Sequence, residues 1–171
     1  MDSETGLTLG EVLEQAQEQD LDLMEMEEGE TASFIATYAS TTTDVSVTRG
    51  SCYYYSDYDL GSYLTYKYTV SFNNVTATAY CIQPSKSSPG DGVFKITRLG
   101  DGKKLAKVCY YGTKASGVNG FFKTEHPDFS AGKQFVITHL AVSYASGSDD
   151  AFSGANTNGQ ALAMELYNYC M

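Results

Sequence analysis

The sequence predicts an α+β fold, an antiparallel β-barrel or sandwich with two short helices packed at one end. Residues 31–125 are rich in Tyr, Thr, Val and Ser and are punctuated by Gly and Asn, which is typical of half-buried strands. After residue 126 the pattern changes to two segments of helical character. A chain of 171 residues is long enough to bury one core without metal or disulfide crosslinks.

The clearest strand pair is a hairpin predicted over residues 62–83. Apolar side chains alternate with mostly polar ones from Leu64 to Phe72 and again from Val75 to Cys81, and Asn73-Asn74 supplies a turn that tolerates positive φ. The alternation places Cys81 on the inward face at the end of the second strand. Further strands are predicted at 32–41, 93–99 and 105–111.

Two helices are predicted in the last third of the chain. The segment from Phe135 to Tyr144 is apolar nearly all round, which suits a buried helix, and Ser130 is its expected N-cap. A second helix is predicted from Gln160 to Tyr169, with Asn158 as its cap. Between them, residues 146–159 form a polar, Gly-rich loop.

Charge separates the chain into a predicted acidic leader, residues 1–30, and a module, residues 31–171. The leader holds eleven of the 21 acidic residues and no Lys or Arg, so we expect it to be disordered or partly helical, with a partner-binding helix as the alternative. The net charge of -10 argues against a nucleic-acid partner. No apolar run is long enough for membrane insertion, and the wide cysteine spacing with two histidines predicts no structural metal and no cofactor.

Two motifs carry a resemblance to a known family. The segment Ala79-Tyr80-Cys81-Ile82-Gln83-Pro84 resembles the cysteine motif of the thioester domains of Gram-positive surface adhesins. The segment Thr138-His139-Leu140-Ala141 resembles the family's Thr-Gln-x-Ala helix, which supplies the acyl donor. Residues 107–112 are also similar to a strand-and-Gly segment of that family, with Cys109 where Leu is expected, and the resemblance covers about residues 45–170.

The resemblance implies an extracellular module on a bacterial cell surface, anchored to the cell wall through regions outside this chain. Its partner would be a host or neighbouring-cell surface protein. In such domains a glutamine carboxamide acylates the cysteine thiol with loss of ammonia, and a host amine attacks the resulting thioester. Imidazole cannot supply the acyl group, so His139 predicts a module without a working thioester. Cys81 and His139 are then reactive or vestigial thioester positions, and Thr138, Tyr80 and Gln83 are candidate ligand-binding residues.

Other roles for these residues stay open. Gln83, Gln134 and Gln160 are conceivable substitute acyl donors. If His139 lies within hydrogen-bond reach of Cys81, it would lower the pKa of the thiol and make a nucleophile for acyl transfer or hydrolysis. In the simplest interpretation both residues only pack, His139 as a satisfied core histidine and Cys81 as a small buried side chain.

The remaining candidates are tyrosines and cysteines. Tyr53-Tyr54-Tyr55 with Tyr58 would form an aromatic surface for a non-covalent ligand, or would simply cover the core. Cys52, Cys109 and Cys170 are expected to pack or to contribute one disulfide, and the sequence leaves the pairing open.

Overall fold

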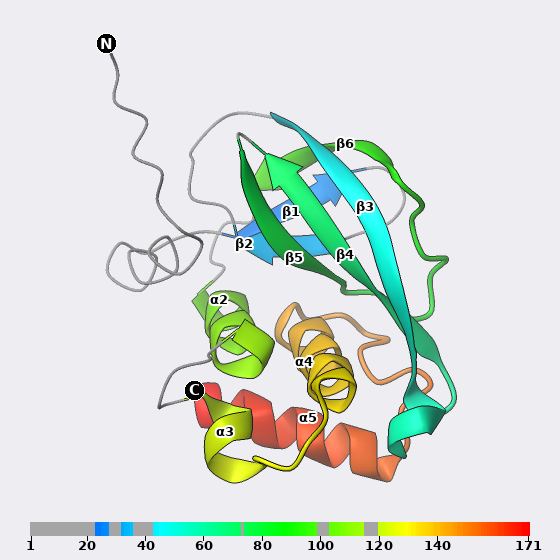
Figure 1. Ribbon diagram of the computed structural model, residues 1–171, viewed down its shortest axis with the longest axis vertical. Coiled ribbons are helices and arrows are strands. Elements are labelled where there is room, and N and C mark those ends of the chain that lie inside the picture. Colours follow the sequence, from blue (N-terminus) through cyan, green and yellow to red (C-terminus); the bar gives the residue numbers. More distant parts are fainter. Residues whose placement is uncertain (1–22, 28–31, 36–42, 73, 99–102, 115–119) are drawn as a thin grey trace.

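The computed structural model describes residues 23–27, 32–35, 43–72, 74–98, 103–114 and 120–171. Within them the protein has two layers, an antiparallel β-barrel above a layer of helices (Figure 1). The strands are β1 (Leu23–Glu27), β2 (Ala32–Ile35), β3 (Thr43–Tyr54), β4 (Leu64–Phe72), β5 (Val75–Cys81) and β6 (Gly92–Arg98). The helices are α2 (Lys103–Cys109), α3 (Phe121–Glu125), α4 (Ala131–Ala145) and α5 (Thr157–Cys170), with short turns η1 (Tyr55–Tyr58) and η2 (Tyr110–Lys114). The predicted α+β class is confirmed.

The strand order is β1-β2-β5-β4-β3-β6, and β1 also pairs with β6, which closes the barrel. The predicted hairpin is confirmed as β4 and β5, whose register pairs Val70 with Ala77. Asn74, in the turn between them, has a φ of 62°, as its residue type allows. The strand expected near residue 93 is β6.

Strand β1 lies inside the segment predicted as an acidic leader. Its five residues pair with β2 and β6, so the expectation of a disordered or partly helical leader is wrong for Leu23–Glu27. The side chains of this segment have no clear period, so the sequence does not mark it as a strand. Its backbone N–H and C=O groups are instead held by pairing with β2 on one side and β6 on the other. Residues 1–22 and 28–30 of the predicted leader lie outside the described residues, as do 36–41 of the strand expected at 32–41.

The strand predicted at residues 105–111 is wrong, because this segment forms α2 followed by the kinked turn η2. Leu105, Val108 and Cys109 are its buried residues, and their spacing of three and four is that of one helix face. The strand was predicted because the composition of residues 31–125 is rich in residues typical of strands. Helix α3 was also not predicted.

Helix α4 has the predicted N-cap, because the Ser130 hydroxyl accepts a hydrogen bond from the backbone N–H of Lys133 at 3.3 Å. Helix α5 begins earlier than predicted, and its cap is Asn156 rather than Asn158. The Asn156 side chain accepts from the N–H of Gly159 at 2.8 Å, whereas Asn158 donates to the carbonyl of Asp59 at 3.0 Å.

Two cores meet at the end of β5. Ala79 belongs to the small barrel core, while Tyr80 and Ile82 belong to the larger core among the helices. A similar change occurs in β4, where Leu64 is 37% exposed and Thr65 only 3%, the opposite of what the alternation predicts. The β3–β4 register shifts between Arg49 and Cys52, and beyond this irregularity β4 turns its other face to the helices. A polar side chain is thereby buried against α4.

Candidate functional site around Cys81 and His139

Cys81 is the last residue of β5 and is 6% exposed, buried as its strand phase predicts. The backbone of β2 pairs beside it, with Ala32 opposite Cys81 in the register. Its thiol lies 3.5 Å from the carbonyl oxygen of Gln83, to which it donates. The thiol is therefore held at the junction between the barrel and the helical layer.

His139 lies in the middle of α4 and is 1% exposed. Residues 135–143 of this helix are all buried, as expected for a helix that is apolar nearly all round. The Nδ1 atom lies 3.4 Å from the hydroxyl oxygen of Thr65, and Nε2 has no hydrogen-bond partner among the described residues. Burial lowers the pKa of His139 to about 4, so the ring is neutral at physiological pH.

Ser143 and Tyr55 connect the end of β5, where Cys81 lies, to α4, the helix that carries His139. Ser143, one helical turn beyond His139, donates its hydroxyl hydrogen to the carbonyl oxygen of Cys81 at 3.3 Å. The ring of Tyr55 lies 6.1 Å from the ring of His139. Burial, and to a smaller extent the groups of Cys81 and Tyr63, raises the pKa of Tyr55 above its usual value, so Tyr55 also neighbours Cys81.

Tyr55 is a site residue that the sequence analysis missed. It was assigned to a tyrosine run on an edge strand, yet it is fully buried and its hydroxyl has no hydrogen-bond partner among the described residues. An unpaired buried hydroxyl costs free energy on the order of 1–3 kcal/mol. We call Cys81, His139, Tyr55 and Thr65 the Cys81 site. It contains a thiol, a neutral imidazole and a phenol. Two of its polar atoms, the Tyr55 hydroxyl oxygen and Nε2 of His139, have no hydrogen-bond partner among the described residues.

Tyr80 and Thr138, predicted to bind ligand, make internal contacts. The Tyr80 hydroxyl shares a hydrogen bond with the hydroxyl of Thr113, and its ring stacks on Phe135 at 5.2 Å. Thr138 donates its hydroxyl hydrogen to the carbonyl oxygen of Gln134 at 2.8 Å. Both are buried, at 2% and 0% exposure, so their side chains are not available on the surface.

The three glutamines considered as substitute acyl donors lie at the starts of α4 and α5 and in the turn after β5. The carboxamide nitrogen of Gln134 donates to the carbonyl of Phe129 at 2.7 Å, at the start of α4. That of Gln160 donates to the carbonyl of Ala155 at 3.3 Å, on the exposed start of α5. Gln83 is half-buried in the turn after β5, where its backbone carbonyl accepts from the N–H of Lys86.

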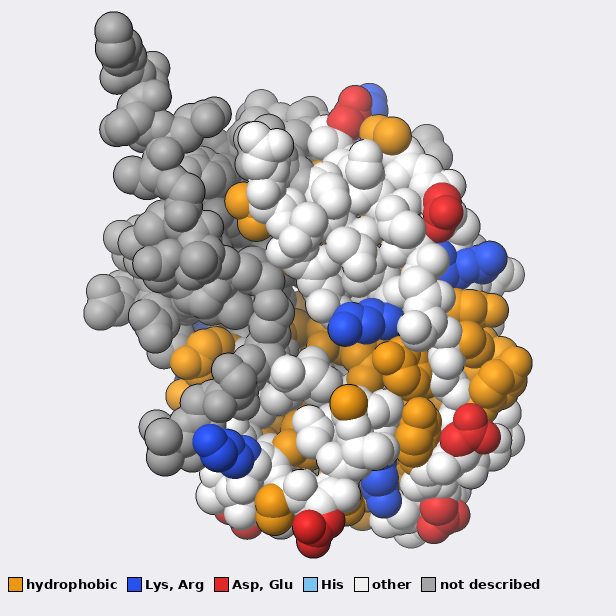
Figure 2. All heavy atoms as spheres, in the orientation of Figure 1, with side chains coloured by type: hydrophobic (Ala, Val, Ile, Leu, Met, Phe, Trp, Pro, Cys, Tyr) orange, Lys and Arg blue, Asp and Glu red, His pale blue; other side chains and the backbone are white. Residues whose placement is uncertain are grey.

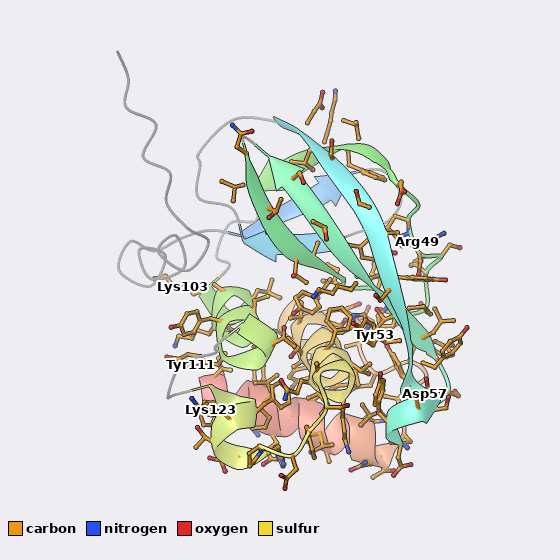
Figure 3. All side chains as sticks on the ribbon, in the orientation of Figure 1. Arg49, Tyr53, Asp57, Lys103, Tyr111 and Lys123 are labelled. Atoms are coloured by element: carbon orange, nitrogen blue, oxygen red, sulfur yellow. The ribbon has the colours of Figure 1, made fainter. Side chains whose placement is uncertain are left out.

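The predicted tyrosine surface is divided by the fold. Tyr53 packs between β3 and α4 against Phe135, with ring centroids 4.8 Å apart (Figure 3), and Tyr58 is half-buried. Tyr54 is 51% exposed, Tyr63 is 41% exposed, and Leu64 pairs with Tyr54 across the strands. Figure 2 shows hydrophobic side chains gathered where the barrel meets the helical layer. The exposed apolar surface in this region, which we call the Tyr54 face, therefore comprises the opposed residues Tyr54 and Leu64 together with Tyr63, which precedes Leu64 in the chain.

Among the described residues, no group of three or more His, Cys, Asp or Glu side chains is placed to hold a metal ion. None of the described helices is long and apolar enough to cross a membrane.

The fold and site define a module in which a buried cysteine ends a barrel strand and is hydrogen-bonded through its backbone to a buried helix. The family model of the thioester domain matches residues 44–171. The chain therefore belongs to the thioester domain family. No curated protein and no solved structure gave a significant match.

Proposed function

We propose that the protein is a bacterial surface attachment module that binds its partner without an internal thioester. His139 carries this proposal: it is 1% exposed and has no carboxamide, and the segment Thr138-His139-Leu140-Ala141 resembles the family's Thr-Gln-x-Ala helix with His in place of the acyl donor. Gln134 and Gln160 support it, since both carboxamides are hydrogen-bonded at helix starts. Cys81 and His139 are then vestigial thioester positions.

The binding partner would be a protein on a host or neighbouring cell, and the domain would be displayed outside a Gram-positive cell wall. We assign the non-covalent contact to the Tyr54 face, because its aromatic side chains are exposed while Tyr80 and Thr138 are buried. Aromatic side chains of this kind supply much of the binding energy at protein interfaces. Of the three residues predicted to bind ligand, Tyr80, Gln83 and Thr138, Gln83 is partly exposed. It lies two positions after Cys81 in the chain.

The mass of the denatured protein tests the loss of the thioester. Wild-type protein should show its full sequence mass, gain nothing from methylamine and be alkylated directly at Cys81. His139→Gln restores the Thr-Gln-x-Ala motif and should lower the mass by one ammonia; methylamine should then add one methylamine to the acyl group of the introduced glutamine and release the Cys81 thiol for alkylation. The double variant with Cys81→Ala is the matched control and should keep its full mass. A wild-type mass already short by one ammonia would refute the proposal.

Attachment is tested separately with beads that carry the domain and are added to cultured epithelial cells. Wild-type and Cys81→Ala beads should bind equally, and Tyr54→Ala/Tyr63→Ala beads should bind several-fold less. Binding that depends on Cys81 and resists boiling in detergent would instead indicate covalent capture.

A second candidate function is acyl transfer by Cys81 with His139 as the base. The observation in its favour is that Nε2 of His139 is neutral, buried and unpartnered. In such a step Nε2 accepts the proton of the Cys81 thiol, and the sulfur attacks an ester carbonyl and expels the alcohol. Nitrophenyl acetate provides the test: rapid acetylation of Cys81 that is lost in His139→Ala would support this function, and acetylation at the rate of a free thiol would exclude it.

A further inference from the structure

Two buried cysteines lie outside the Cys81 site. Cys109 is the last residue of α2 and Cys170 the last residue of α5, and each is 6% exposed. Both belong to the core among the helices, which contains neither Cys52 nor Cys81. Cys109 and Cys170 are therefore the two cysteines that share this core, and no disulfide joins them in this structure.

The contacts around this pair bring the two helix ends together. The rings of Tyr111 and Tyr169, which follow Cys109 by two residues and precede Cys170 by one, meet edge to face at 6.0 Å. In Figure 1 the C-terminal end of α5 lies next to α2, and the two helices are in contact. Figure 3 shows Tyr111 on this side of the molecule.

Electrostatic effects agree with this placement. Burial raises the pKa of Cys109 to about 12, and the neighbouring Cys170 contributes to the increase. Burial also raises the pKa of Cys170 to about 12, while nearby Lys107 acts in the opposite direction. Both effects agree with the contact between α2 and α5.

We propose that Cys109 and Cys170 form a disulfide bond when the chain folds in an oxidising medium. Such a bond would join residues 61 positions apart in the chain (170 minus 109) and connect α2 to α5. It would leave Cys81 as a free thiol for the site described above. The pairing does not depend on whether a thioester forms.

A small disulfide, such as oxidised glutathione, is the oxidant. One cysteine thiolate attacks it and releases one reduced glutathione, and the second cysteine then displaces the other. The two cysteines together lose two electrons and two protons, and the glutathione disulfide gains them. We expect the exchange to occur during folding, because burial leaves little thiolate on either residue in the folded chain.

The test is refolding of the reduced, denatured protein with and without oxidised glutathione, followed by alkylation under denaturing conditions. We expect a loss of two hydrogens, alkylation of Cys52 and Cys81 only, and a peptide that links Cys109 to Cys170. Cys52→Ser, the matched control, should keep the linkage, and Cys109→Ser should lose it. The oxidised wild-type protein should melt several degrees above the reduced protein.

Wild-type protein alone can overturn the proposal. Four alkylated cysteines after oxidative refolding would do so, as would a linkage that involves Cys52 or Cys81. Stable glutathione adducts on both Cys109 and Cys170 would also refute it, because they would show that the two sulfurs cannot meet.

Discussion

The hydroxyl of Ser143 lies 3.3 Å from the carbonyl oxygen of Cys81, and this buried hydrogen bond joins α4 to the last residue of β5. Ser143 is fully buried, and His139 lies one turn before it on the same helix. The bond thereby fixes the strand that carries the thiol against the helix that carries the imidazole.

Replacement of Ser143 by Ala should loosen this junction. The variant leaves the carbonyl of Cys81 without this donor in a buried setting, so the free energy of unfolding should fall by about 1–2 kcal/mol. Alkylation of Cys81 in the native protein should become faster. Ser146→Ala is the control, since the Ser146 hydroxyl donates to the carbonyl oxygen of Ser143 at the end of α4 and the substitution removes that bond alone. An unchanged alkylation rate in Ser143→Ala would show that the bond does not shield the thiol.

Stability should fall in mild acid because of His139. Its pKa is about 4 in the folded protein and 6.5 in an unfolded chain, as burial disfavours the charged ring. Between these values the unfolded chain binds a proton that the folded protein does not, so the free energy of unfolding decreases as the pH drops from about 6.5 towards 4. The loss attributable to His139 is at most about 3 kcal/mol.

Denaturant unfolding at pH 7.5 and pH 5 measures this effect. His139→Leu, which cannot form a thioester, should lose less stability between the two pH values than the wild-type protein, and the difference isolates His139 because His126 and the carboxylates are common to both. Parallel pH profiles would show that the ring at position 139 is protonated inside the fold.

The parts of the fold that depend on local periodicity could be predicted from the sequence. The β4–β5 hairpin alternates with period two around a turn that contains Asn74, and α4 has both an apolar surface and a capping serine, Ser130. The position of Cys81 follows from the same alternation. These elements are formed by contacts close in sequence, so a single sequence contains the necessary information.

The other parts depend on contacts between distant segments. Strand β1 is defined by its pairing with β2 and β6, and the burial of Thr65 depends on α4, which lies 74 positions away at His139. Tyr55 could not be distinguished from Tyr53 and Tyr54, because a run of three tyrosines has no alternation that selects the buried one. The spacing of Leu105, Val108 and Cys109 did carry a helical signal, which the β-rich composition around it obscured.

Removal of the Tyr55 hydroxyl should not destabilise the protein. The hydroxyl is buried without a partner among the described residues, so Tyr55→Phe keeps the ring and removes an unsatisfied group, which should raise the free energy of unfolding by about 1 kcal/mol. Tyr80→Phe is the matched control, because it breaks the bond to Thr113 and should lower stability by a similar amount. A loss of stability in Tyr55→Phe, measured by thermal denaturation, would show that the hydroxyl has a partner in solution, such as a buried water molecule.

Gly112 should be the least replaceable glycine beside the Cys81 site. It lies in the kink of η2, and a Cβ atom built there would be 2.6 Å from the side chain of Thr138, the residue before His139. Both groups are buried, so Gly112→Ala must displace either η2 or α4, and we expect a loss of about 2–3 kcal/mol in the free energy of unfolding. Gly90→Ala is the control, since no atom lies within 4 Å of its added Cβ. Thr138→Ala should partly rescue Gly112→Ala by vacating the contact, and the absence of rescue in denaturant unfolding would place the strain in the backbone of the kink.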